Sequence, residues 1–157
     1  MPASAIAAYD GTSFSALDAG LTTAIPICNA LGAFDRGHGR ELFAGGNFTA
    51  AGPVASSSLA GWDGQTWRPF APSTSVGGPV LAFGQLAIGA ERRLVAAGRF
   101  QAAAETGAHY VATWDGRRWS ALGDGTGLLP IVLADFDDGA SGKLFAGGGY
   151  DGTGGPT

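Results

Sequence analysis

The sequence predicts an all-β fold of many short strands and turns, and three observations lead to this prediction. Glycine provides 28 of the 157 residues and proline 8, so the two together reach about 23% of the chain against an average of roughly 12%. No segment shows the periodicity of an amphipathic helix, in whose interior each glycine costs about 1 kcal/mol relative to alanine. The bulky apolar residues recur in short clusters, which is typical of strands and not of a disordered chain.

A repeat of about 52 residues orders these strands along the chain. The tripeptide Tyr9-Asp10-Gly11 returns as Trp62-Asp63-Gly64 and again as Trp114-Asp115-Gly116. An aromatic residue follows each copy at a short distance: Phe14, Trp67 and Trp119. The return of rare aromatic residues at one period indicates repeated structure, not a bias in composition.

Two further blocks keep the same period. The first is a strand-like block that ends in small residues, and its copies are 42–48 with Gly45 and Gly46, 94–100 with Gly98, and 144–150 with Gly147 and Gly148. The second is the turn-like block Phe34-Asp35-Arg36-Gly37, which returns as Phe136-Asp137-Asp138-Gly139. Three blocks that coincide at one period define a repeated structural unit.

Each repeat is interpreted as four short strands. In the copy that begins at Pro26 we expect strands at 27–34, 40–45, 59–62 and 66–70. The first of these is largely apolar, which predicts a strand buried on both faces. Asp63-Gly64 is expected to start a tight hairpin between the last two strands, because glycine tolerates a positive φ. Four strands in a unit of this length are the blade of a β-propeller.

The chain is therefore expected to be a single β-propeller segment over residues 1–157, with about three blades of four antiparallel strands. The repeats span approximately 5–52, 53–104 and 105–155. The glycine pairs end the second strand of each repeat, which predicts a close approach of backbones where neighbouring blades converge. Trp67 and Trp119 are expected on the outer strand, where each covers the gap between one blade and a neighbouring blade.

At these residues the sequence resembles the kelch-like repeats of galactose-oxidase-type propellers. The resemblance is carried by Leu-Phe-Ala-Gly-Gly-Asn-Phe-Thr at 42–49, Trp-Asp-Gly-x-x-Trp at 62–67 and Phe-Asp-Asp-Gly at 136–139. It is nearest to the glycine-rich variety in large secreted or cell-surface bacterial proteins and in the fungal cortical marker of cell polarity. The resemblance implies an extracellular or cell-surface location. It implies no copper oxidase chemistry, because the chain has one cysteine, two histidines and no matching Tyr-Cys grouping.

Three blades do not make a ring, because known propellers have typically four to eight. If each open end face held ~400 Å² of apolar surface, its exposure would cost ~10 kcal/mol, as much as the whole stability of a domain. Two interpretations follow. The favoured one is a segment of a larger protein, in which further blades of the same parent chain complete the ring. The other is association with a second copy of this chain, giving six blades, with strands of one chain completing the end blade of another.

Charge and hydropathy exclude several classes of partner. The formal net charge is −4, and no cluster of lysine and arginine is large enough for a nucleic-acid surface. No apolar run approaches the 18 residues of a membrane span, so neither nucleic acid nor membrane insertion is expected. Cys28 stands alone in an apolar stretch and is interpreted as a small buried residue, not a reactive thiol.

Few side chains point to chemistry, and no catalytic residue, cofactor or metal site is predicted. Asp135, Asp137 and Asp138 form an acidic cluster, which makes them weak candidates for calcium binding. A β-turn explains Asp137 and Asp138 without a metal. His38 and His109 lie in different repeats and lack the convergent partners that a metal needs.

The loops that follow the second strands are long and differ between repeats, and loops of this kind on a repeated scaffold are where binding is expected. Their polar candidates are Asn47, Arg99, Gln101 and Glu105. The sequence therefore predicts a non-catalytic scaffold for protein or ligand binding. Two alternatives remain open: a propeller enzyme domain, hydrolase or lyase, with acid and base residues in a central channel, and a lectin-like oligomeric propeller. In the second, a carbohydrate ligand would stack on tryptophan, for which the candidates are Trp62, Trp67, Trp114 and Trp119.

Overall fold

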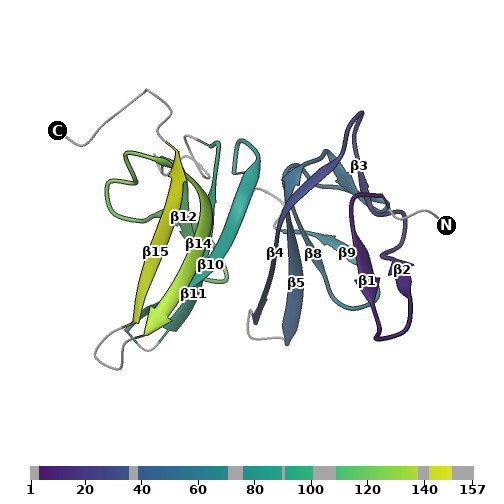
Figure 1. Ribbon diagram of the computed structural model, residues 1–157, viewed down its shortest axis with the longest axis horizontal. Coiled ribbons are helices and arrows are strands. Elements are labelled where there is room, and N and C mark those ends of the chain that lie inside the picture. The colour runs from purple at the N-terminus through teal and green to yellow at the C-terminus, as the bar shows by residue number, and fades with distance from the viewer. Residues whose placement is uncertain are drawn as a thin grey trace.

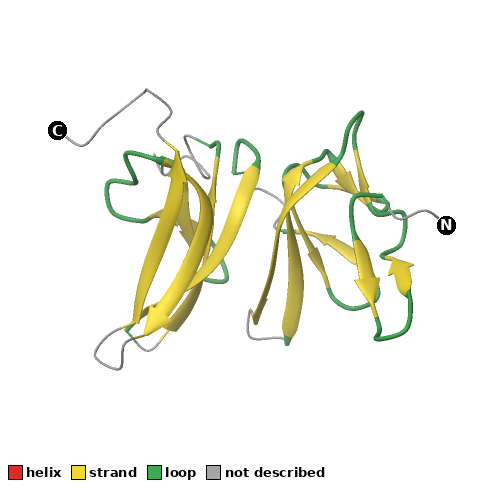
Figure 2. Cartoon of the chain, in the orientation of Figure 1, coloured by secondary structure: helices red, strands yellow, loops and turns green. Residues whose placement is uncertain are grey.

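A computed structural model describes residues 4–35, 39–70, 76–89, 91–100, 109–137 and 142–149. Every sheet in these residues is antiparallel, and no helix occurs among them (Figure 2). The predicted all-β fold is confirmed. The sheets remain open, and none of them closes into a barrel or ring in the described part of the chain.

Two four-stranded sheets form the middle of the chain. The β4 sheet has the order β4-β5-β8-β9, with strands Ile27–Asp35, Arg40–Asn47, Leu59–Trp62 and Trp67–Pro69. The β10 sheet has the order β10-β11-β12-β13, with strands Val80–Ile88, Glu91–Gly98, Val111–Trp114 and Trp119–Ala121. The strands predicted for the copy that begins at Pro26 agree with the bounds of β4, β5, β8 and β9 to within two residues. The segment between β5 and β8 contains further short strands that were not predicted.

A two-stranded hairpin lies at each end of this pair. The N-terminal hairpin consists of β1 (Ala7–Tyr9) and β2 (Phe14–Ala16), and the C-terminal hairpin of β14 (Leu129–Asp137) and β15 (Gly142–Gly149). In the repeat, the first hairpin corresponds to the third and fourth strands of a sheet, and the second to the first and second strands. The two hairpins lie at opposite ends of the molecule (Figure 1).

The first strands of successive sheets lie side by side, with β10 between β4 and β14 (Figure 1). Two side-chain hydrogen bonds link the first pair: Gln85 Nε2 donates to the carbonyl of Ala33 at 3.1 Å, and Asn29 Nδ2 donates to that of Val80 at 3.4 Å. At Gly84 of β10, an added Cβ would lie 3.1 Å from Leu133 Cβ of β14. Small residues and amide groups therefore let the first strands approach closely.

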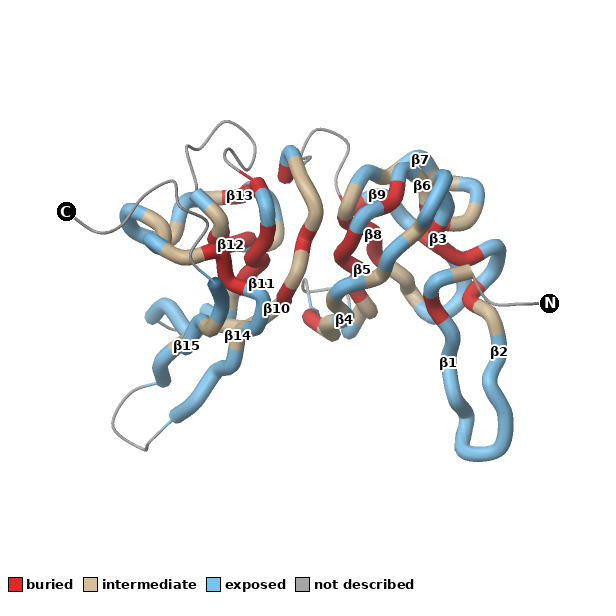
Figure 3. Tube along the Cα trace, turned by 45° about the horizontal axis from the view of Figure 1, so that its top comes forward, coloured by how far each residue is buried: buried red, intermediate tan, exposed pale blue. Residues whose placement is uncertain are grey.

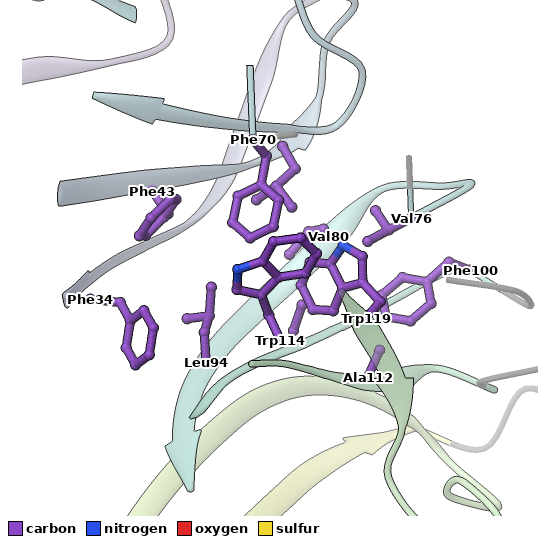
Figure 4. Packing of buried hydrophobic residues seen from close by; sticks show 12 residues of the cluster. Phe34, Phe43, Phe70, Val76, Val80, Leu94, Phe100, Ala112, Trp114 and Trp119 are labelled. Atoms are coloured by element: carbon purple, nitrogen blue, oxygen red, sulfur yellow. The ribbon is translucent and has the colours of Figure 1, made fainter. Parts of the chain in front are cut away.

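The main core lies between the β4 and β10 sheets. Trp114 and Trp119 are each 2% exposed and face Phe43 and Phe70 across this space (Figure 4). The ring of Phe70 stacks on that of Trp119 with 5.2 Å between centroids. Trp119 therefore covers the gap between two sheets, as the sequence predicted, and the sheet that it packs against is the preceding one.

Trp67 makes the same kind of contact one repeat earlier. It is 3% exposed and packs with Ile6, Leu17 and Leu21 of the N-terminal segment. Its indole Nε1 donates a hydrogen bond of 3.0 Å to the carbonyl of Leu17. The outer-strand tryptophan is thus a repeated anchor that ties each sheet to the unit before it.

The glycine pairs have two separate roles, which corrects the single role that the sequence predicted. A Cβ on Gly45 would lie 2.7 Å from Val80 of the next sheet, so this glycine permits the expected approach of neighbouring units. A Cβ on Gly46 would instead overlap the carbonyl oxygen of Ile27, on the first strand of its own sheet. Gly98 and Gly148 have the same neighbour in their sheets, because the first strand bulges there. The second glycine therefore serves pairing within a sheet.

The prediction that the first strand is buried on both faces was wrong for β4 and β14. In β4, Ile27 is 45% exposed and Leu31 52%, and most of β14 is also exposed (Figure 3). Of the three first strands in the described residues, only β10 lies between two others, β4 on one side and β14 on the other. Burial of this strand therefore depends on its neighbours in the array, and a strand at the end of the array lacks one.

Candidate functional site

The predicted binding residues Asn47 and Arg99 occupy the same position of two repeats. Asn47 is the last residue of β5, Arg99 directly follows β11, and both side chains are exposed. The backbone N–H of Arg99 donates to the carbonyl of Pro79 at 3.0 Å, which holds the chain in place while the side chain projects outward. The other two candidates, Gln101 and Glu105, lie outside the described residues.

The segment after β5 is structured and is not the open loop that the sequence predicted. Strands β6 (Ala50–Ala51) and β7 (Val54–Ala55) form a small hairpin, and β6 also pairs with β3 (Leu21–Thr22). Phe48 anchors the start of this segment at 2% exposure, as Phe100 does after β11 at 1%. The repeat of an aromatic residue at this position was visible in the sequence, whereas the two-residue strands carry no sequence signal.

The aspartates of the repeated Asp-Gly turns are engaged in structure. Asp10 Oδ1 accepts hydrogen bonds from the backbone N–H of Thr12 and of Ser13 at 2.8 and 2.9 Å, and the hydroxyl of Thr12 also donates to it. These donors lower the pKa of Asp10 to about 2, with the Thr12 hydroxyl as the largest cause. The following glycine has a φ of +101°, which is the conformation that the sequence predicted for the turn.

The equivalent aspartates behave alike. Backbone N–H groups of Thr66 and Gln65, followed by the Arg68 side chain, hold the pKa of Asp63 well below its usual range. Desolvation alone would raise the pKa of Asp115, but the N–H groups of Arg118 and Arg117 lower it more. All three carboxylates are therefore ionised turn caps, and none is tuned toward proton transfer near neutral pH.

The acidic cluster of the last repeat lies on β14. Asp135 and Asp137 are two residues apart on this strand and both are exposed, while Asp138 lies outside the described residues. No group of three or more potential metal ligands gathers in the described part of the chain. A shallow hollow of about 90 Å³ between β10 and β14 also contains Arg92 and Lys143, so this surface mixes both signs of charge.

A second hollow crosses the three first strands. It has a volume of about 130 Å³ and brings Gln85 and Asp135 together with Gly32, Ala33, Phe83, Gly84 and Leu94. Gln85 is already bonded to the backbone of Ala33. Asp135 is the one carboxylate in this hollow among the described residues.

A third hollow is apolar and lies beside β15. Its volume is about 370 Å³, and its walls are Leu86, Val111, Leu122, Thr126, Leu133 and residues 143–146. Except for Lys143 and Thr126, these side chains are apolar. The sequence did not predict this feature, because its residues come from four strands and the segment after β13, which pack together only in the folded chain.

The remaining candidates are placed as follows. Trp67, Trp114 and Trp119 are buried, so their rings are closed to a sugar, and Trp62 is partly buried. Cys28 is half-buried, and burial raises the pKa of its thiol. His109 is exposed, and His38 lies outside the described residues.

No helix in the described residues is long and apolar enough to cross a membrane. Comparison of the whole chain with family models, with curated proteins and with solved structures gave no match in any of the three.

Proposed function

We propose that the chain is a β-propeller segment that serves as a non-catalytic scaffold for binding a protein or another ligand. The main observation in support is that the sheets are alike from repeat to repeat, whereas the segments after their second strands differ. The β4 and β10 sheets share their order and their buried anchors, whereas the residues that follow Asn47 and Arg99 differ in sequence between the two repeats. Variable segments on a constant scaffold are the usual arrangement of binding proteins.

The propeller is supported by the array of sheets. Four-stranded antiparallel sheets with their first strands side by side are the blades of this architecture, and the spacing of about 52 residues fits it. The resemblance to kelch-like repeats supports an extracellular or cell-surface setting. In this proposal the ring is completed by units beyond the two complete sheets.

The binding role is tested on the exposed side chains at the ends of β5 and β11. The probes are a glycan array and a panel of purified extracellular matrix proteins. We expect a ligand whose binding weakens at least tenfold in Arg99→Ala or Asn47→Ala. The matched control is Arg117→Ala. It removes an exposed arginine from the turn between β12 and β13, and it keeps the hydrogen bond from the backbone N–H of residue 117 to the Asp115 carboxylate. Equal loss in the control would contradict a site on this face.

The enzyme alternative depends on Asp135 in the hollow across the first strands. Hydrolysis of generic ester or glycoside substrates that Asp135→Asn abolishes would replace the scaffold proposal, because one carboxylate in a channel would then act as acid or base. The lectin alternative is weakened because three of its four candidate tryptophans are buried in the core and cannot stack on a sugar. A glycan array without binding would remove it.

A further inference from the structure

The two end hairpins are complementary halves of one four-stranded sheet. In the N-terminal hairpin Tyr9 pairs with Phe14, as Trp114 pairs with Trp119 in the β10 sheet. In the C-terminal hairpin Phe136 pairs with Lys143, as Leu86 pairs with Arg93. The first hairpin therefore supplies strands three and four, and the second supplies strands one and two.

We propose that β15 of one copy pairs with β1 of a second copy, so that the two hairpins form a complete sheet between chains. The inference rests on the proposed propeller. Within one chain the hairpins lie at opposite ends of the molecule (Figure 1), so the pairing joins copies head to tail. Such a contact is heterologous and gives a closed ring when its rotation fits.

The register of this pairing follows from the complete sheets. Ala44 lies opposite Ala60 between β5 and β8, and Ala96 lies opposite Ala112 between β11 and β12. The corresponding residues are Ala146 on β15 and Ala7 on β1, and they preserve the alanine pair. Neither outer edge is paired with another described strand, so both offer a row of backbone groups for antiparallel pairing.

The apolar hollow beside β15 matches the side chains that this pairing brings. Its walls Val111, Leu122 and Leu144 occupy the repeat positions of Leu59, Phe70 and Leu94, which surround Trp114 and Trp119 in the main core (Figure 4). The residues at the positions of those two tryptophans are Tyr9 and Phe14 of the N-terminal hairpin. The hollow is thus the counterpart of a filled tryptophan site, and a second copy carries the aromatic pair to fill it.

The aromatic pair is exposed and already arranged for insertion. Tyr9 is 58% exposed and Phe14 75%, with 4.8 Å between their ring centroids. The centroids of Trp114 and Trp119 are 5.4 Å apart. Aromatic side chains of this kind are the usual anchors of protein interfaces.

The opposite face of the C-terminal hairpin also exposes large apolar side chains. Phe136 and Phe145 are exposed at 61% and 53%, whereas Phe34 and Phe43, at the same repeat positions, are buried against the next sheet. In the joined sheet, these two rings would face β4 of the second copy. There Leu31 is also exposed, so one contact covers the open faces of both partners.

The charges across this contact are complementary. In the β10 sheet, the N–H groups of Arg118 and Arg117 lower the pKa of Asp115, and the charges of Arg118 and Arg93 lower it further. Lys143 and Asp10 hold the same repeat positions, so the joined sheet brings an ammonium group near an ionised carboxylate.

Each copy contributes two complete sheets and two halves, so two copies close at six units, within the four to eight of known propellers.

The first test is the mass of the 157-residue chain in solution by sedimentation equilibrium. We expect twice the 15.7 kDa chain mass at micromolar concentration and dissociation on dilution. The variant Tyr9→Ala/Phe14→Ala should weaken association at least tenfold, while Ile88→Ala, which trims an exposed residue away from the contact, should not. Circular dichroism verifies that each variant is folded. A chain that stays monomeric, a mass that grows without limit, or a double variant that associates normally would overturn the proposal.

The second test fixes the register by disulfide formation. In a Cys28→Ser background, Ala7→Cys/Ala146→Cys places thiols on directly opposed residues, whose Cα atoms in an antiparallel pair are close enough for a bond. Oxidised glutathione should convert this variant to a linked dimer on a non-reducing gel. Ala8→Cys/Ala146→Cys shifts one thiol to the other face of β1 and should link poorly. Equal linking of both variants, or a link within one chain, would overturn the register.

The two proposals fail separately. A monomer that still binds its ligand through Arg99 would refute the pairing of copies and leave the scaffold intact. A ring of two copies without any ligand would refute the binding role alone.

Discussion

The β10 sheet and the C-terminal hairpin share a repeat but not an environment. Val95 on β11 is fully buried, and Phe145 at the same position of β15 is 53% exposed. On the outer strands, Trp119 is 2% exposed and Phe14 75%. The end hairpins keep large apolar residues at these positions although no neighbouring sheet buries them. The apolar pattern of the repeat therefore fits a sheet that has neighbours on both faces. The difference teaches that this molecule is an array, whose units are stabilised by the units beside them.

The largest effect is expected where the array is complete. Trp119→Ala should lower the free energy of unfolding by about 3–5 kcal/mol, because it empties a packed site between two sheets. Phe14→Ala, measured by urea denaturation at a dilution where the chain is monomeric, should change it by less than about 0.5 kcal/mol. Equal losses at both positions would show that the end hairpin is as well packed as the middle, and the comparison would fail.

Two glycine substitutions are expected to differ in their cost to stability, one where strands pair closely and one on an open surface. Gly46→Ala should cost at least about 1–3 kcal/mol, because the new methyl group overlaps the carbonyl oxygen of Ile27. The control Gly142→Ala lies on β15, where a Cβ would have no neighbour within 4 Å, and it should leave stability unchanged or slightly raised. Thermal unfolding of both variants checks this, and a tolerated Gly46→Ala would contradict the bulge geometry.

A smaller effect is expected from the indole hydrogen bond. Trp67→Phe removes the donor to the Leu17 carbonyl, whereas Trp119 Nε1 has no hydrogen-bond partner among the described residues. Trp67→Phe should therefore cost about 1 kcal/mol more than Trp119→Phe, beyond the loss of ring size that both share. Urea denaturation of the two variants under identical conditions measures the difference. A greater cost at Trp119 would reverse the assignment.

The smallest effect is expected from acid at the end hairpin. The pKa of Asp10 is lowered from 3.8 to about 2, so its ionised form stabilises the β1–β2 turn above pH 3.8. This contribution is lost as the pH falls from 3.8 toward 2. Carboxyl chemical shifts followed by NMR should give a midpoint near pH 2 for Asp10, and Thr12→Val should raise it. A midpoint at 3.8 would show that the turn is open in solution.

The four strands of the copy that begins at Pro26 were predictable because repeated turns and glycine pairs mark their ends. The Asp-Gly turns, the aromatic residues and the glycine pairs recur at one period, and the four strands of the first copy were predicted to within two residues. The short β6–β7 hairpin was missed because two-residue strands have no periodicity to detect. The roles of Gly45 and Gly46 were merged into one, since adjacent glycines are identical in sequence but have different neighbours in space.

The candidate site was predicted less completely. Asn47 and Arg99 were identified from loop position, and they are exposed at equivalent places. The hollow beside β15 could not be predicted, because Val111, Leu122 and Leu144 are far apart in the chain and become one surface only after the sheets pack.

The sequence by itself determined the all-β class, the repeat and the local turns, because these depend on neighbouring residues and on the conformational freedom of glycine. Only the tertiary structure decided which apolar side chains are buried. Trp114 and Tyr9 occupy the same repeat position, yet one is in the core and the other faces solvent. Burial depends on the presence of a neighbouring sheet, and that is a property of the array and not of the residue.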